Sequence, residues 1–501
     1  MSRYFSDPRA ALRHPDMLYI DGRWVDPESG GGLSLISPSD EAVHSCVAEA
    51  SVAEVDAAVR AARRAFDEGP WPLMSPAERA SRLRAFAAAL RQRADSFAAL
   101  WSLQTGIPHG MARHALQNPG MIYDYYADLI CETVLFESRQ RDNGGYAIIA
   151  REPVGVVAAV TPWNHPSHLM ALKAAPALAM GCTVIAKPPP EAPMDVFLLA
   201  EAAEEAGLPP GVFNIAPADR AGSDHLVRHP GVDKVSFTGS AATGAHISSV
   251  CGARMARSSM ELGGKSAAIV LDDIDLARIA PLLVETGGKR MAGQGCAFLT
   301  RVLVSRKRHD ALAAALAAAM ATVKVGHAFH PETEMGPIAM KRQLDKVLSY
   351  IERGKAEGAT LATGGGRPET LLGVEGGKGF YVAPTLFANV TNDMAIAREE
   401  IFGPVLSLIA YDDEEQAIRI ANDNPYGLNG AVFTDDREKA FAIARRIRAG
   451  NFTQNGLEHD SKFPFGGYKM SGTGREGGSY GLDLYSEIKT IYMAQPPAGL
   501  A

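Results

Sequence analysis

Cys296 ends a glycine-rich segment in which its sulfur atom could meet a small molecule. In Gly293-Gln294-Gly295-Cys296, the glycines carry no side chain that would shield the thiol. A lone cysteine is more often a buried apolar residue than a nucleophile. However, Glu261, in Glu261-Leu262-Gly263-Gly264-Lys265, could act as a mobile general base on water. Together the two segments indicate a thiol nucleophile that works with a carboxylate base.

Asn164 could supply a third function, the stabilisation of an oxyanion. It lies in Thr161-Pro162-Trp163-Asn164-His165-Pro166, between an apolar run and a helical stretch. Ligands of open α/β sheets bind at the carboxyl ends of strands, where this segment is expected. The same amide could instead cap the helix predicted over residues 167–180, and the motif leaves both interpretations open.

Three short motifs of other enzyme classes lack the context that their chemistry needs. Residues 472–477 match the dinucleotide fingerprint, but no apolar strand precedes them. Residues 477–481 match a nucleophile elbow, yet no histidine follows His459. Gly264-Lys265-Ser266 resembles the end of a phosphate loop, but Ser259 replaces its first glycine. We therefore do not expect a serine hydrolase or a nucleotide triphosphatase.

His225 and His229 are four residues apart and could share one helix face as metal ligands. They lack the adjacent glutamate of a zinc-protease motif. We therefore expect two surface histidines and no metal site.

The segments that position these residues alternate between helices and strands. Residues 52–103 have a helical pattern, with Leu83, Phe86, Leu90, Phe97 and Leu100 on one stripe and a helix start at Ser75-Pro76. Apolar runs at 154–160, 183–186, 212–215 and 234–237 predict strands of one parallel sheet covered on both faces. Further runs at 267–271, 301–305, 405–411 and 430–434 predict a second α/β layer.

The composition is that of an ordinary globular protein, and the cysteines are expected to be free thiols. Of 501 residues, 47% are hydrophobic and the formal net charge is -7, which disfavours nucleic-acid binding. The charged residues between Arg3 and Asp16 leave no room for a signal peptide or anchor, and we expect no membrane span. The five cysteines are Cys46, Cys131, Cys182, Cys251 and Cys296. Because they are odd in number and widely spaced, we expect free thiols and a cytoplasmic protein.

Several segments occur together in an order that resembles the aldehyde dehydrogenase superfamily. Besides those containing Asn164, Glu261 and Cys296, they are Ile185-Ala186-Lys187-Pro188, Phe237-Thr238-Gly239-Ser240, Glu400-Ile401-Phe402-Gly403-Pro404 and Pro464-Phe465-Gly466-Gly467-Tyr468-Lys469. The resemblance extends over roughly residues 20 to 490 and includes about seven motifs, so chance is a poor explanation.

The resemblance implies two Rossmann-like parallel α/β domains and a small β-hairpin and edge-strand element for oligomerisation. The cofactor-binding domain would comprise residues 1–134 and 153–266, with 456–478 returning to it. The catalytic domain would comprise residues 267–455. Residues 135–152 and 479–501 would form the oligomerisation element, with a turn at Asp142-Asn143-Gly144, and imply a homodimer or homotetramer.

The resemblance also implies that the aldehyde is oxidised to a carboxylic acid through a thioester on Cys296. The Asn164 amide and the Cys296 N–H would hold the oxyanion, and Glu261 would activate water. Lys173 and Glu476 would carry the proton outward. Because the thiolate is the nucleophile, we expect the site to favour ionisation of Cys296.

NAD or NADP is the implied cofactor, with NAD weakly favoured. Lys187 and Glu400 would bind ribose hydroxyls, and Phe402 would pack beside the nicotinamide ribose. Many relatives that prefer NAD have a glutamate three positions after this lysine, where the chain has Pro190 followed by Glu191, so the preference stays open. The full predicted cofactor set is Thr161, Pro162, Trp163, Lys187, Gly222, Phe237, Thr238, Gly239, Ser240, Gly244, Leu262, Gly263, Glu400 and Phe402.

By analogy the aldehyde would lie in a tunnel with a polar mouth near Glu458-His459-Asp460. Its predicted walls are His165, His168, Leu169, Leu172, Gly295, Ala297 and Phe465. Two alternatives are a CoA-acylating semialdehyde dehydrogenase and a non-catalytic relative of the same fold. The presence of Glu261 disfavours the former, because hydrolysis of a thioester needs that base.

Overall fold

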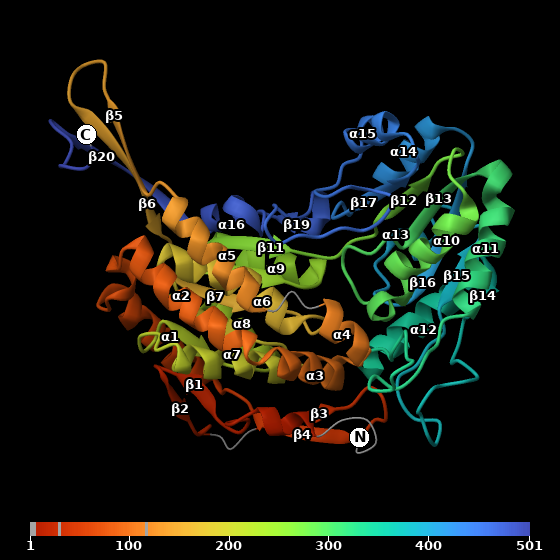
Figure 1. The fold of residues 1–501 in the computed structure, drawn as a ribbon, viewed down its shortest axis with the longest axis horizontal. Helices are drawn as coiled ribbons and strands as arrows, with labels where there is room; N and C mark the ends of the chain where they lie inside the picture. The colour runs from red at the N-terminus through yellow and green to blue at the C-terminus, as the bar shows by residue number, and fades with distance from the viewer. Residues whose placement is uncertain (1–6, 29–31, 116–118, 501) are drawn as a thin grey trace.

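The chain folds into two α/β lobes with a long β ribbon projecting from one of them (Figure 1). The computed structural model describes residues 7–28, 32–115 and 119–500. Arg3, part of the N-terminal segment in which no signal peptide was expected, lies outside them. Within the described residues, no helix is long and apolar enough to cross a membrane.

The first lobe is built on an eight-stranded sheet whose five central strands are parallel. Its edges are antiparallel, because β19 pairs with β11 and β1 pairs with β9 and β2. In spatial order the strands are β19 (Gly472–Thr473), β11 (Arg257–Glu261), β10 (Lys234–Thr238), β7 (Val156–Val160), β8 (Thr183–Lys187), β9 (Phe213–Ile215), β1 (Leu18–Ile20) and β2 (Arg23–Val25).

Helices cover both faces of this sheet, which explains why its strands are apolar without alternation. Along β7, Val157 and Ala159 enter one hydrophobic cluster, while Val156 and Ala158 enter another on the opposite face. The helices of this lobe are α1 (Val52–Asp67), α2 (Pro76–Arg91), α3 (Ala94–Thr105), α4 (His109–Ala115), α5 (Pro119–Glu132), α6 (Pro166–Met180), α7 (Met194–Glu205), α8 (Arg220–Arg228), α9 (Ala241–Ala253) and α16 (Gly478–Asp483).

The second lobe repeats this plan with a seven-stranded sheet, parallel except at β14. Its strands in spatial order are β14 (Thr360–Thr363), β15 (Thr385–Ala388), β16 (Val405–Tyr411), β13 (Arg301–Ser305), β12 (Ala267–Val270), β17 (Gly430–Phe433) and β18 (Thr453–Gln454). Its helices are α10 (Leu276–Val284), α11 (His309–Ala321), α12 (Lys341–Ala356), α13 (Ala395–Arg398), α14 (Glu414–Asn422) and α15 (Arg437–Ala444).

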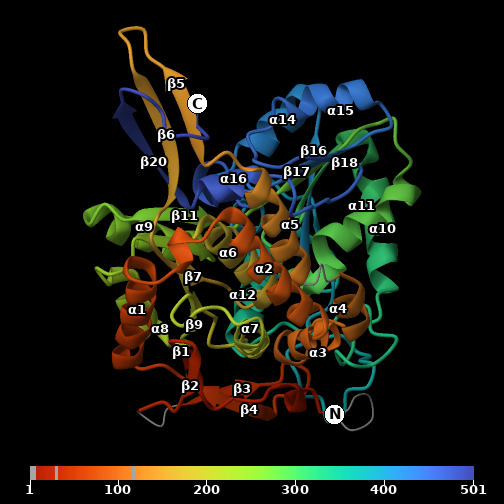
Figure 2. The ribbon, with the colours of Figure 1, turned by 60° about the vertical axis from the view of Figure 1, so that its left-hand side comes forward.

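A three-stranded sheet forms the projecting ribbon, which stands away from the body in both views (Figures 1 and 2). β5 (Phe136–Gln140) and β6 (Tyr146–Pro153) make an antiparallel hairpin, and β20 (Ser486–Met493) pairs with β6. The predicted turn is present, with Gly144 at φ 86°. β3 (Gly32–Ile36) and β4 (Val43–Ala48) form a separate two-stranded sheet.

The predicted strands and the helical stripe are confirmed in position. The eight predicted runs correspond to β7, β8, β9, β10, β12, β13, β16 and β17. Leu83, Phe86, Leu90, Phe97 and Leu100 are all buried. The predicted helical stretch 52–103 is three separate helices, because a capping box at Ser75 starts α2 and Arg93 precedes α3.

Candidate active site

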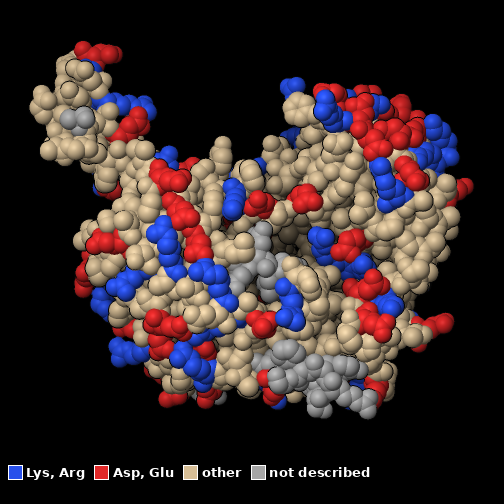
Figure 3. All heavy atoms as spheres, viewed as in Figure 1, with Lys and Arg blue, Asp and Glu red and all other residues tan. Residues whose placement is uncertain are grey.

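A cavity of about 730 Å³ lies between the two lobes and contains the predicted nucleophile, base and oxyanion donor. The space-filling view shows the surface hollowed between the lobes (Figure 3). Asn164 and Glu261 reach it from the first lobe, while Cys296 reaches it from the second. The cavity therefore brings together three side chains that are far apart in the sequence.

The backbone before Cys296 is irregular and closely packed. A π-helical turn, Glu285–Lys289, is followed by Met291, Ala292 and Gly293, all with positive φ. A Cβ added at Gly293 would lie 2.2 Å from the carbonyl carbon of Gly403. Glycine is thus required here for close packing of two loops, and the thiol of Cys296, partly exposed, faces the cavity.

The glycines after Glu261 are also packing residues. A Cβ at Gly263 would lie 2.2 Å from Oε2 of Glu400, and one at Gly264 would lie 2.4 Å from the carbonyl oxygen of Cys296. Glu261 itself is the last residue of β11. The two glycines therefore let the end of this strand approach Glu400 and the Cys296 loop closely, and the expected mobility of Glu261 stays a prediction.

The carboxyl group of Glu261 is buried and has no hydrogen-bond partner among the described residues, at either oxygen. Burial raises its pKa well above the usual range, as does the charge of Glu476, while Lys173 and Arg475 oppose the shift. A carboxylate without partners is a stronger proton acceptor than a solvated one. The geometry is that of a general base facing a cavity.

Lys173 and Glu476 form a buried ion pair beside Glu261. Nζ of Lys173 lies 2.5 Å from Oε1 of Glu476, and the two side chains are 0% and 3% exposed. Glu476 lines the cavity, and its charge acts on Glu261. The structure thus places both predicted relay residues near the base, with Glu476 lining the cavity and Lys173 fully buried and not among the lining residues.

Asn164 is fixed at both its backbone and its side chain. Its carbonyl oxygen accepts a hydrogen bond from Nε1 of Trp101 at 2.8 Å, and its Nδ2 donates to the carbonyl oxygen of Gln294 at 3.1 Å. The N-cap of α6 is His165, so the alternative that Asn164 caps this helix is wrong. An amide nitrogen carries two hydrogens, and one remains to serve an oxyanion near Cys296.

The protein's own residues keep the Cys296 thiol protonated. Burial, followed by the charges of Glu400 and Glu261, raises its pKa to about 12. The expectation that these side chains favour the thiolate is therefore wrong, because the ionisable groups acting on the sulfur are acidic. A cation brought next to the sulfur, or neutralisation of either carboxyl group, would lower this pKa.

Most predicted cofactor residues lie at the cavity. The ones that line it are Pro162, Trp163, Thr238, Gly239, Ser240, Leu262, Gly263, Glu400 and Phe402. Thr161, Lys187, Gly222, Phe237 and Gly244 are not among the lining residues. Gly222 N–H is bound to the Asp219 side chain at 2.8 Å, so this amide already has an acceptor.

The polar atoms on this side fit a phosphorylated, hydroxyl-bearing ligand. Ser240 is the N-cap of α9, whose first turn follows β10 at the cavity and leaves N–H groups that can bind an anion. The hydroxyl groups of Thr161 and Thr238 are buried and lack partners within the described part of the chain. Burial lowers the pKa of Lys187, at the end of β8, to about 8.

Glu400 and Phe402 form the second-lobe wall of this part of the cavity. Glu400 accepts a hydrogen bond from the Gly264 N–H at 3.1 Å, and burial raises its pKa. Phe402 has φ 59° and contacts Trp163 edge to face, with ring centroids 5.2 Å apart. A left-handed phenylalanine is uncommon, and here it directs its ring against the first lobe.

All seven residues that were predicted to form the tunnel line the same cavity. They are His165, His168, Leu169, Leu172, Gly295, Ala297 and Phe465. Trp101, Met111, Met291 and Phe298 line it too and were not predicted. In the sequence, Trp101 is only the residue after the apolar stripe of its helix, and nothing near it indicates a place in the site. Its stacking on His165, with ring centroids 4.1 Å apart, joins residues that are distant in the sequence and cannot be seen in the local pattern.

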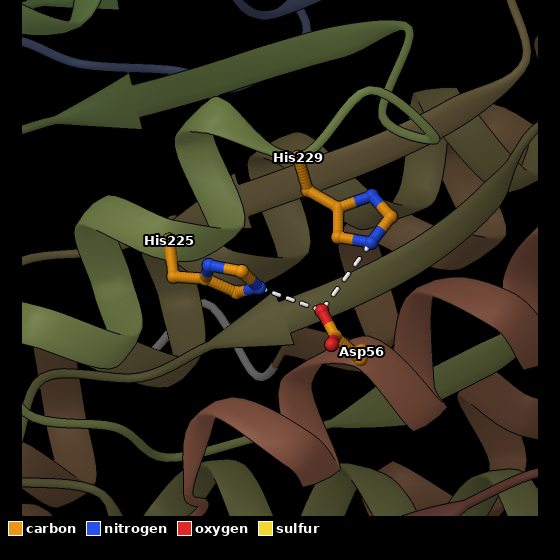
Figure 4. A group of neighbouring side chains, drawn as sticks. All are labelled: Asp56, His225 and His229. Carbon is orange, nitrogen blue, oxygen red and sulfur yellow. Dashed lines mark hydrogen bonds and ion pairs between the residues drawn. The ribbon is translucent and has the colours of Figure 1, made fainter.

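Asp56, His225 and His229 form a second cluster whose residue types suit a metal (Figure 4). His225 Nε2 and His229 Nε2 lie 2.6 and 3.4 Å from Asp56 Oδ1. The Gly231 N–H donates to His229 Nδ1 at 3.0 Å, so Nε2 carries the ring proton. A metal-bound histidine has the opposite arrangement. The cluster links α1 to α8, and its two histidines are partly exposed, with 35% of the His225 side chain and 18% of the His229 side chain accessible.

Comparisons with known proteins agree with this geometry over nearly the whole chain. The model of the aldehyde dehydrogenase family matches residues 24–491. Geranial dehydrogenase of Castellaniella defragrans is 42% identical, over 95% of this chain and 98% of its own. The 3-succinoylsemialdehyde-pyridine dehydrogenase of a Pseudomonas species is 40% identical, over 94% and 97%.

Solved structures give the same result. A Mycobacterium tuberculosis aldehyde dehydrogenase, crystallised with NAD+, superposes with a TM-score of 0.92 at 41% identity, covering 97% of this chain and 99% of that one. An aldehyde dehydrogenase of Pseudomonas syringae, crystallised with NAD+ and octanal, has a TM-score of 0.90 at 39% identity and covers 100% of both chains. The chain belongs to the aldehyde dehydrogenase family.

Proposed function

We propose that this protein oxidises an aldehyde to a carboxylic acid with NAD as the hydride acceptor. The observation that carries the proposal is the convergence of Cys296, Asn164 and Glu261 on one cavity, next to the first turn of α9. A nucleophile, an oxyanion donor and a base in one pocket are what acyl chemistry through a thioester needs.

The residues of this chain divide the reaction between them. The Cys296 thiol, which is partly exposed, loses its proton to solvent as its sulfur bonds to the aldehyde carbon, and Nδ2 of Asn164 donates to the oxygen that becomes negative. Once the carbon is oxidised to the thioester, Glu261 takes a proton from water, whose oxygen attacks the acyl carbon and releases the sulfur. The buried Lys173–Glu476 pair, beside Glu261, takes up the proton.

Residues from both lobes would hold the cofactor. Ser240 and the first turn of α9 would bind its pyrophosphate, Lys187 and Glu400 its riboses, and Trp163 and Phe402 its nicotinamide end. Bound NAD would supply the hydride acceptor and a positively charged ring, and a positive charge near the Cys296 sulfur would lower the raised pKa of this thiol. The crystallised relatives that contain NAD+ support this choice of cofactor.

NAD rather than NADP is favoured by Glu191. Its charge acts on Lys187, so a carboxylate lies close to the amine that would bind the ribose. A 2′-phosphate would meet that negative charge. Arg342 forms an ion pair with Glu191 and offsets part of the repulsion, so the two cofactors are best compared directly by kcat/KM.

The decisive experiment is a panel of aldehydes assayed with NAD and NADP, for the wild type and Cys296→Ala. We expect reduction of cofactor and formation of acid by the wild type only. CoA is then added to the wild type. Formation of acyl-CoA in place of acid would favour the acylating alternative, and no reduction with any aldehyde would refute the proposed reaction.

We also propose that each of the two large sheets is the centre of one domain. Residues 1–134 and 153–266, with 456–478, would bind the cofactor, and 267–455 would carry the nucleophile. The eight- and seven-stranded sheets support this division.

We further propose that residues 135–152 and 479–501 join subunits into a homodimer or homotetramer. The ribbon carries an exposed apolar set, Phe136, Ile488, Ile491, Tyr492 and Met493, and an open strand edge normally needs a partner. Sedimentation of the full chain tests this.

The five free cysteines support a reducing compartment, the cytoplasm.

A further inference from the structure

A continuous series of rings lines one side of the cavity. Trp101 and His165 are stacked with centroids 4.1 Å apart and planes within 7°, and His165 and His168 are stacked at 4.6 Å and 14°. His459 meets His168 edge to face at 6.2 Å and Phe465 at 4.8 Å. We call these five residues the ring wall. All of them line the cavity.

The ring wall is attached to the reaction centre. His165 follows Asn164 directly, and Nε1 of Trp101 donates to the Asn164 carbonyl at 2.8 Å. His168, Leu169 and Leu172 lie three, four and seven residues after His165, so α6 presents them on one face. The ring wall therefore lies beside the oxyanion donor, within the cavity that a group attached to the reacting carbon would occupy.

Burial disfavours the charged form of two histidines of the wall, His165 and His459. Burial lowers the pKa of His165 well below its usual value, and the neighbouring His168 and His459 add to the effect. Burial likewise lowers the pKa of His459. Glu458, part of the mouth that was expected to be polar, lines the same cavity as these rings and as Leu169 and Leu172.

We infer that the cavity selects aldehydes whose carbonyl carbon is attached to a planar aromatic ring. This inference rests on the proposed oxidation of aldehydes and names its substrate class. Ring pairs contribute about 0.5–1.5 kcal/mol beyond the area they bury, which corresponds to roughly a 2- to 12-fold gain in kcat/KM. A saturated ring of the same size buries similar area without that gain.

Benzaldehyde and cyclohexanecarbaldehyde form the pair for the test, because both carry a six-membered ring, which is planar and conjugated with the carbonyl only in benzaldehyde. Since conjugation also changes intrinsic reactivity, the quantity compared is the ratio of kcat/KM for benzaldehyde to that for cyclohexanecarbaldehyde in different variants. His168→Leu replaces a ring by an aliphatic side chain, so this ratio should fall by about 2- to 12-fold from its value in the wild type. His14→Leu removes a ring contact with Trp24, outside the cavity, and should leave the ratio unchanged.

A binding measurement makes the test independent of turnover. Benzamide and cyclohexanecarboxamide are uncharged analogues, and calorimetry should show tighter binding of benzamide to the wild type and equal binding to His168→Leu. If that variant does not fold, His459→Leu removes a ring carried by a loop and serves the same purpose.

The outcomes separate the two proposals. A ratio of kcat/KM for the two aldehydes that is the same in the wild type and in His168→Leu overturns the ring wall as the source of selectivity. No oxidation of either aldehyde, with a preference for benzamide that His168→Leu abolishes, refutes the proposed reaction but supports the ring wall. Loss of both the reaction and the benzamide preference overturns the inference.

Discussion

Replacement of Glu261 by glutamine should stop the enzyme after one turnover. Hydride transfer does not need this carboxylate, but hydrolysis of the thioester does. General-base catalysis typically contributes about 100- to 10,000-fold. The Glu261→Gln variant should therefore form one NADH per subunit in a burst, followed by a steady state at least about 100-fold slower than that of the wild type.

The structure indicates that this loss will not come from misfolding. Both oxygens of Glu261 lack hydrogen-bond partners among the described residues, and its pKa is raised by burial and by Glu476. Glutamine has nearly the same shape and no charge, so it breaks no hydrogen bond and removes a repulsion. The thermal midpoint should stay equal to that of the wild type or rise.

Rapid-mixing absorbance of NADH and the mass of the trapped acyl-enzyme measure the burst. In the wild type, hydrolysis should also slow as the pH falls through the raised pKa of Glu261, because only the carboxylate accepts a proton. Glu438→Gln, on an exposed position of α15, is the matched control. An unchanged steady state for Glu261→Gln, or the absence of a burst with no acyl adduct, would refute the assignment of this base.

Four further variants test how the site and its surroundings are supported. Lys173→Met leaves the Glu476 carboxylate buried without its ammonium partner, so unfolding by denaturant should become easier by about 3–5 kcal/mol. The double variant Lys173→Met/Glu476→Gln should recover part of this loss, and additive losses would contradict the pairing. Trp101→Phe removes the hydrogen bond to the Asn164 carbonyl, and at about 1 kcal/mol kcat should fall roughly 5-fold. A change in KM alone would argue against positioning of Asn164. The pKa of Asp195 is raised by burial to about 6, so its contribution to stability is lost as the pH rises through that value. The thermal midpoint of Asp195→Asn should lack this decline, and equal pH profiles for variant and wild type would show that Asp195 is not its source.

The elements that the sequence predicts well are those whose signal is local. Strands β7, β8, β12 and β13 are continuous apolar runs because helices cover both faces of their sheets, and this burial is visible residue by residue. The start of α2 is equally local, since Ser75 and Glu78 cap each other's backbone within one turn. The motifs containing Asn164, Glu261 and Cys296 are also short stretches of neighbouring residues, so the sequence alone was enough to find them.

By itself the sequence determined the class of chemistry, the family resemblance and the order of the strands along the chain. Only the tertiary structure decided the electrostatics and the shape of the cavity. Lys173 and Glu476 pair across 303 residues, and Trp101 reaches Asn164 across 63. The raised pKa values of Cys296 and Glu261 depend on desolvation. Burial, long-range pairing and ring stacking arise when distant segments pack together, so they leave no pattern in neighbouring residues.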